Sequence, residues 1–262
     1  MSFLLHSFFA LCISYAAIAI LTGVLFRVAL SDELVRITPI LISTLIAFIF
    51  LRDAVYRKFP VIVMSGEPLY VGRRAWYWVL IAIVLWTFAT ECFVAYGQAS
   101  GMLTPSTGNA LDGPMGRSIS MLIVMIVVGV IIAPVYEELI FRGMLMAAIA
   151  DRWNVWAGIA VNSLLFGIVH FREGWTTYLV ATAVLYSVIA LRSKYIWPAI
   201  LAHASHNFLS IFRSLLGYGD MWLLKPHVSE SNSTLFAVGA IVFASGAVFA
   251  AWRTGPNKVK PT

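Results

Sequence analysis

The residues best suited to chemistry are acidic and imidazole side chains that lie inside apolar stretches. Glu137 and Glu138 are followed by Arg142 in the run Glu-Glu-Leu-Ile-Phe-Arg. On a helix, Glu138 and Arg142 share one face in the order that favours pairing, whereas Glu137 points about 100° away. An ionisable group inside an apolar span needs a charged partner or a watery cavity. We therefore expect Glu138 to hold Arg142 and Glu137 to face a cavity.

A second cluster, Phe166-Gly-Ile-Val-His170, places an aromatic ring and an imidazole on one face of the next predicted helix. A short turn is predicted near Trp153-Asn154, and Glu137 and His170 are almost equally far from it along the chain. In an antiparallel helical hairpin, residues equidistant from the turn lie at the same depth. The sequence therefore predicts that Glu137 and His170 meet, provided that both helices are continuous.

The third cluster is His203-Ala-Ser-His206-Asn207. His203 and Asn207 share one helix face and can both donate hydrogen bonds, whereas His206 lies on another face. Glu137 and His170 could activate a water molecule, and a His/Asn pair could stabilise an oxyanion. Since the chain has no Gly-x-Ser-x-Gly motif and Ser205 has no evident base, attack by water is favoured over attack by a side chain.

The composition predicts a polytopic membrane protein. Apolar residues make up 61% of the 262 positions and charged residues only 11%, too few to cover a soluble surface. A helix needs about 20 apolar residues to cross the hydrocarbon core. The fold expected is all-α, with about eight transmembrane helices around a central catalytic cavity, in a single domain over 1–262 with its catalytic core at about 118–216. The predicted spans are 3–26, 35–51, 75–97, 118–135, 156–171, 175–191, 196–216 and 234–252, with a kink expected at Pro134.

The net charge of +6 does not indicate nucleic-acid binding, because the basic residues are spread between the apolar runs. Their excess in alternate loops predicts that both termini are cytoplasmic. The stretch 3–26 is interpreted as a retained first span, since it lacks a basic start and a clear cleavage site. The expected surroundings are the lipid bilayer of a cell membrane.

These three motifs, in this order on separate membrane helices, resemble those of the CPBP family of intramembrane proteases. That family comprises type II CAAX prenyl proteases and bacteriocin-processing (Abi-type) glutamic proteases. The matching residues are Glu137, Glu138, Arg142, Phe166, His170, His203 and Asn207. The resemblance implies an endopeptidase that cleaves a membrane-associated protein or peptide, in CAAX-type, leader or C-terminal anchor processing.

The resemblance also implies a role for each motif. Glu137 and His170 would hold and deprotonate the attacking water, and His203 with Asn207 would form the oxyanion site. Glu138 and Arg142 would support the architecture, with Glu138 assisting catalysis, and Phe166 would line the cavity.

Three alternatives stay open beside this protease. A zinc ion held by Glu137, His170 and His203 is chemically feasible, but the absence of HExxH and the His/Asn pair favour a site without a cofactor. A proton-coupled secondary transporter could use the same Glu and His residues as a relay, although no inverted repeat is evident. The third alternative is a catalytically inactive member of the family that acts as a scaffold. Taken singly, His170 and Asn207 would be interhelical hydrogen-bonding residues.

Overall fold

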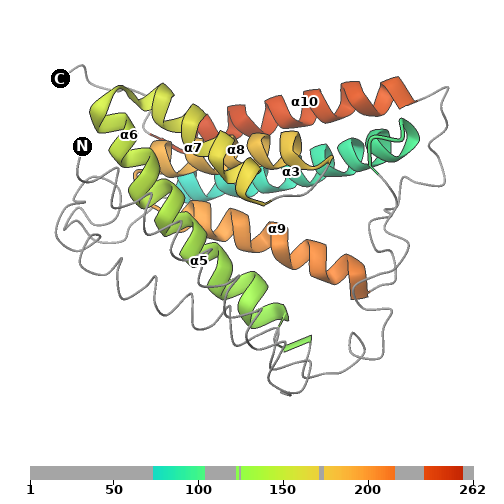
Figure 1. The fold of residues 1–262 in the computed structure, drawn as a ribbon, viewed down its shortest axis with the longest axis horizontal. Helices are drawn as coiled ribbons and strands as arrows, with labels where there is room; N and C mark the ends of the chain where they lie inside the picture. The colour runs from blue at the N-terminus through green and yellow to red at the C-terminus, as the bar shows by residue number, and fades with distance from the viewer. Residues whose placement is uncertain (1–72, 104–121, 124, 171–173, 216–232, 256–262) are drawn as a thin grey trace.

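The described part of the chain is helical. The structure, a computed structural model, describes residues 73–103, 122–123, 125–170, 174–215 and 233–255 (Figure 1). Its elements are α3 (Arg73–Ala99), η1 (Met125–Ile132), α5 (Ala133–Glu138), η2 (Leu139–Met146), α6 (Ala147–Arg152), α7 (Val155–Val169), α8 (Thr176–Ser193), α9 (Trp197–Leu215) and α10 (Ser233–Trp252). These ranges contain no strand, which confirms the all-α prediction.

Among the helices that the structure describes, three are long and apolar enough to cross a membrane, namely α3, α8 and α10. They correspond to the predicted spans 75–97, 175–191 and 234–252. The helix α7 is apolar but shorter, at 15 residues. The chain is thus an all-α polytopic membrane protein, while the predicted spans 3–26 and 35–51 lie outside the described residues.

The segment from η1 to α6 carries the acidic motif. Figure 1 shows it as a long tilted run of helix, with α9 beside it. Pro134 stands in the first turn of α5, where its missing N–H removes no hydrogen bond within that helix. The elements on either side of α5 are π-helical, and π-helical turns are frequent at functional sites. Glu137 and Glu138 therefore stand between two widened stretches of helix.

The predicted turn at Trp153-Asn154 is present and begins α7. Asn154 has an extended backbone (φ −169°), and its side chain accepts a hydrogen bond from the backbone N–H of Ala157 at 2.9 Å. This is the arrangement of an N-cap residue. A Cβ at Gly158 would lie 2.8 Å from the carbonyl oxygen of Met146, so glycine allows α7 to pack closely against the preceding helical segment. The hairpin returns the chain towards the depth of Glu137.

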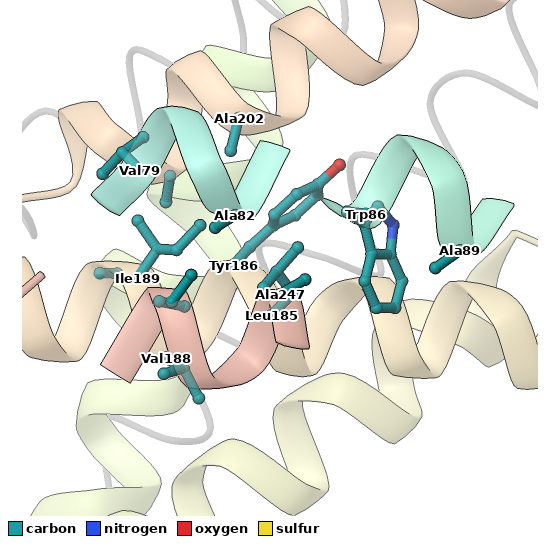
Figure 2. Close-up of a cluster of buried hydrophobic side chains, with 14 of the residues drawn as sticks. Val79, Ala82, Trp86, Ala89, Leu185, Tyr186, Val188, Ile189, Ala202 and Ala247 are labelled. Atoms are coloured by element: carbon teal, nitrogen blue, oxygen red, sulfur yellow. The ribbon is translucent and has the colours of Figure 1, made fainter. Parts of the chain in front are cut away.

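The helix α8 lies at the centre of the described bundle, in contact with α3, α7, α9 and α10. Figure 2 shows part of the core, in which α3 and α8 side chains interdigitate around Tyr186. Towards α7, a Cβ at Gly167 would overlap Val180 and stand 3.0 Å from the Thr176 carbonyl oxygen. This close approach holds the end of α7, and therefore His170, against α8.

Basic and aromatic residues meet at one end of the bundle. Arg192, at the end of α8, donates from Nε to the carbonyl oxygen of Trp252 at 2.8 Å. The guanidinium of Arg253 lies 5.5 Å from the centre of the Trp78 ring, near the start of α3. Since Trp252 precedes Arg253 in the chain, both arginines lie at the same end of the bundle.

Candidate active site

The acidic motif forms a buried ion pair. Arg142 Nη1 donates to Oε1 of Glu138 at 2.8 Å, and both side chains are fully buried. Nη2 of the same guanidinium donates to the carbonyl oxygen of Ala183 on α8 at 3.1 Å. The pairing predicted from the spacing is therefore present, and it also ties the acidic segment to α8. A buried charge without such partners would be very costly.

Glu138 has a second partner that the motif spacing does not predict. Nδ1 of His203 lies 2.9 Å from Oε1 of Glu138, the same oxygen that accepts from Arg142. An ionised carboxylate can only accept hydrogen bonds, so Nδ1 of His203 carries the hydrogen. The opposite ring nitrogen, Nε2, faces Glu137. Glu138 thus fixes the orientation of an imidazole as well as holding an arginine.

Glu137 lies between two histidines, as the hairpin argument predicts for His170. Its Oε2 is 3.8 Å from Nε2 of His170 and 3.8 Å from Nε2 of His203. These distances are too long for direct hydrogen bonds and are in the range that a bridging water spans. Oε2 is buried and has no hydrogen-bond partner among the described residues. One carboxylate oxygen and two imidazole nitrogens therefore converge on a common point.

His170 and Phe166 are fixed together at the end of α7. Nδ1 of His170 lies 2.6 Å from the carbonyl oxygen of Phe166, so it donates to that carbonyl and Nε2 is the free acceptor of a neutral ring. The Phe166 ring is buried, with its centre 4.5 Å from that of His170 and 5.9 Å from that of His203. The guanidinium of Arg142 lies over its face at 4.7 Å. Phe166 is thus a packing surface shared by both histidines and the arginine.

Asn207 is placed differently from the other predicted site residues. Its Nδ2 donates to the carbonyl oxygen of Gly129 in η1 at 2.8 Å. One amide hydrogen therefore connects α9 to the segment that precedes the acidic motif, and the second hydrogen is available to another acceptor. No described contact joins Asn207 to Glu137 or His170, so its oxyanion role stays a prediction.

His206 lies in a different part of the site region, at the interface between α3, α8 and α9. Its Nε2 lies 3.1 Å from the hydroxyl of Tyr178, which in turn lies 2.8 Å from Oγ1 of Thr90. The ring of Tyr178 stacks on Trp86. His206 is thus held by α8 and α3, and no described contact joins it to Glu137.

Further side chains from α7 and α8 surround the ion pair, and one of them, Tyr186, is not predicted by the sequence. Tyr186 stacks on His203 with ring centres 5.0 Å apart. Ser187 donates to the carbonyl oxygen of Ala183, and Asn162 on α7 donates to Ser187 at 3.2 Å. Tyr186 stands in an apolar run without any motif, and only the packing of α8 against α9 reveals its contact with His203. For Asn162 the sequence predicts an interhelical contact, and the hydrogen bond to Ser187 on α8 confirms it.

The donor set can be compared with what a zinc ion requires. Carboxylate and imidazole are suitable ligands, but in a tetrahedral site with bonds of about 2.0–2.1 Å the ligand atoms lie about 3.3–3.4 Å apart. The two distances from Glu137 Oε2 are 3.8 Å, which is wider. Among the described residues no group of three His, Cys, Asp or Glu side chains is arranged to hold a metal ion.

Comparison with known proteins supports the resemblance. Residues 119–209 match the family described as "Type II CAAX prenyl endopeptidase Rce1-like". The chain is also 31% identical, over 91 residues, to "Putative membrane peptidase YdiL" of Bacillus subtilis (strain 168). That alignment covers 35% of this chain and 37% of the length of the relative. No solved structure matches the chain significantly. The resemblance drawn from the three motifs is therefore confirmed over the segment that contains them.

Proposed function

We propose that this protein is an intramembrane endopeptidase that hydrolyses a peptide bond of a membrane-associated protein or peptide, using water activated by Glu137 and His170. The observation that carries the proposal is the convergence of Glu137 Oε2 with Nε2 of His170 and of His203, each 3.8 Å away. The family match and the similarity to a protein named as a membrane peptidase support the same class of reaction.

Water activation follows from the hydrogen-bonding capacity of these groups. A water between Glu137 and His170 donates one hydrogen to the carboxylate and the other to Nε2 of His170. That nitrogen accepts because Nδ1 is already engaged with the Phe166 carbonyl. The water oxygen attacks the scissile carbonyl carbon while Glu137 takes the proton, which is general base catalysis by a positioned carboxylate. The same carboxyl group then protonates the departing amine, so the products are a new carboxylate and a new amino terminus.

The carbonyl oxygen becomes an oxyanion during the attack and needs hydrogen-bond donors. His203 donates through Nε2–H when its ring is doubly protonated, and Glu138 stabilises that imidazolium through Nδ1. Asn207 supplies its second amide hydrogen. Donors that are fixed before the reaction stabilise such charge most effectively, because they need no reorganisation. The connection of Asn207 to Gly129 and of His203 to Glu138 provides that fixation.

The proposal is tested by cleavage of a membrane-anchored peptide in liposomes that contain the purified protein. Wild type is expected to cleave, and His170→Ala is expected to lose the activity. The matched control is His206→Ala, which removes a histidine that contacts Tyr178 rather than Glu137. Cleavage that survives His170→Ala contradicts the mechanism. Proton-coupled uptake abolished by the same change, without cleavage, supports the transporter instead. Loss of cleavage on stringent chelation, restored by zinc, supports the zinc enzyme.

We also propose a cell-membrane location with both termini in the cytoplasm. Arg192 and Arg253 lie at the same end of the bundle, and this agreement with the excess of basic residues in alternate loops supports the proposal. A green fluorescent protein fused after Thr262 is expected to fluoresce in intact cells, because this reporter folds in the cytoplasm and not after export in unfolded form. A dark fusion of normal abundance would place the C-terminus on the other side.

A further inference from the structure

The ring of Tyr186 lies flat against the ring of His203. The two ring centres are 5.0 Å apart, and the planes are inclined by 22°. We infer that Tyr186 is a positioning residue that fixes the plane of His203 so that Nε2 of the imidazole points at Glu137, an inference that rests on the proposed function. Tyr186 stands outside the three motifs, and it would act through His203 rather than by touching the substrate.

Tyr186 is itself held rigidly. Its side chain is 1% exposed and is packed in the core between α3, α8 and α10. Figure 2 shows its ring close to Ala82 and Trp86 of α3. The guanidinium of Arg142 lies 5.4 Å from the ring centre. A ring enclosed in this way has little freedom to move, so it can act as a fixed surface for the imidazole.

Tyr186 acts on His203 through its aromatic ring and not through its hydroxyl group. The Tyr186 hydroxyl oxygen is buried and has no hydrogen-bond partner among the described residues. A buried polar group without a partner does not stabilise the fold. A phenylalanine at this position would keep the stacked surface and lose only this hydroxyl. An aliphatic residue would lose the surface itself, and this difference separates the positioning role from a general packing role.

His203 gains from such a surface because its hydrogen bond to Glu138 holds the ring at one edge only. The torsion about the Cβ–Cγ bond of an imidazole has broad minima, so this hydrogen bond narrows the swing of the opposite nitrogen without removing it. The stacked ring of Tyr186 and the edge of Phe166, at 5.9 Å, restrict this motion.

The test compares Tyr186→Leu and Tyr186→Phe in the cleavage assay. Tyr186→Leu is expected to lower kcat by about 10–100-fold with KM within about twofold, because a misplaced donor weakens transition-state binding more than substrate binding. Tyr186→Phe is expected to restore kcat to within about twofold of wild type. Leu185→Ala is the matched control, since Leu185 is the neighbouring core residue and has no ring contact with His203. It is expected to lower thermal stability while kcat changes less than threefold.

A second measurement is independent of activity. The protein labelled with ¹⁵N-histidine contains five histidines, and the His203 signals are assigned by His203→Gln. The Nδ1–H signal of His203 is expected to persist in wild type and Tyr186→Phe and to broaden or disappear in Tyr186→Leu. An unchanged signal and an unchanged kcat in Tyr186→Leu would overturn the inference. If His170→Ala keeps full cleavage, the proposed function fails instead, whatever the Tyr186 signals show.

Discussion

Replacing Glu137 with glutamine is expected to lower kcat by about 10³-fold or more, with little change in thermal stability. Glutamine has the same shape but cannot take a proton from water. Glu137 Oε2 has no hydrogen-bond partner among the described residues, so the substitution breaks no described hydrogen bond at that atom. The measurement is the rate of peptide cleavage in liposomes, together with the unfolding temperature in detergent. The result expected is an inactive protein that folds normally.

The matched control for Glu137→Gln is the same change at the adjacent residue. Glu138 Oε1 accepts hydrogen bonds from Arg142 and His203, and the side chain is fully buried. Glu138→Gln is therefore expected to destabilise the fold by about 3 kcal/mol, because it leaves the buried guanidinium without its counter-charge. The two neighbouring carboxylates would then differ in stability: Glu137→Gln would lose cleavage in a stable protein, whereas Glu138→Gln would lose stability together with the charge that supports His203. Substantial cleavage by Glu137→Gln would contradict the assignment of the general base.

Much of this arrangement could be predicted from local patterns in the sequence. The span limits of α3, α8 and α10 follow from apolar run lengths, and Asn154 signals the turn that begins α7. The pairing of Glu138 with Arg142 follows from helix periodicity, since both residues lie on one helix. The meeting of Glu137 with His170 follows from the geometry of a single hairpin. Each of these predictions depends on residues that are close in sequence or related by one turn.

The features that were missed depend on how helices are rotated against one another, and for His203 and Glu138 also on contact between helices distant in sequence. The bond from His203 to Glu138 joins residues 65 positions apart, and the stacking of Tyr186 on His203 needs the relative rotation of α8 and α9. Helix periodicity gives the face of each residue but not the rotation of one helix against another. The bond from Asn207 to Gly129 depends in addition on the π-helical course of η1, for which the sequence carries no evident signal. Helix periodicity therefore predicts the pairing of Glu138 with Arg142 but not its hydrogen bond with His203.

Replacing Arg142 with methionine is expected to destabilise the protein by about 3–5 kcal/mol, the largest stability effect of any single change around this site. Methionine fills much of the same volume, so the loss is mainly electrostatic. Glu138 would remain fully buried with His203 as its described partner, and the link from the guanidinium to the Ala183 carbonyl would be lost. That carbonyl keeps the hydrogen bond from Ser187 at 2.7 Å, so the loss of stability is expected to come mainly from the buried Glu138 carboxylate. The measurement is the free energy of unfolding in detergent micelles.

The double variant Glu138→Gln with Arg142→Met separates the charge pair from packing. Each single change is expected to lower the free energy of unfolding because it leaves a buried charge unpaired. The double variant leaves neither charge, so its loss of unfolding free energy should be smaller than the sum of the two single losses, by about 2–3 kcal/mol. Arg152→Met is the matched surface control, because Arg152 is exposed at the end of α6, and its change should stay within about 0.5 kcal/mol. Additive losses in the double variant would mean that Arg142 stabilises the fold through its contacts with Phe166 and Tyr186 rather than through Glu138. Recovery of stability without recovery of cleavage is the expected outcome, because the neutral amide that replaces the Glu138 carboxylate cannot stabilise an imidazolium at His203 to the same extent.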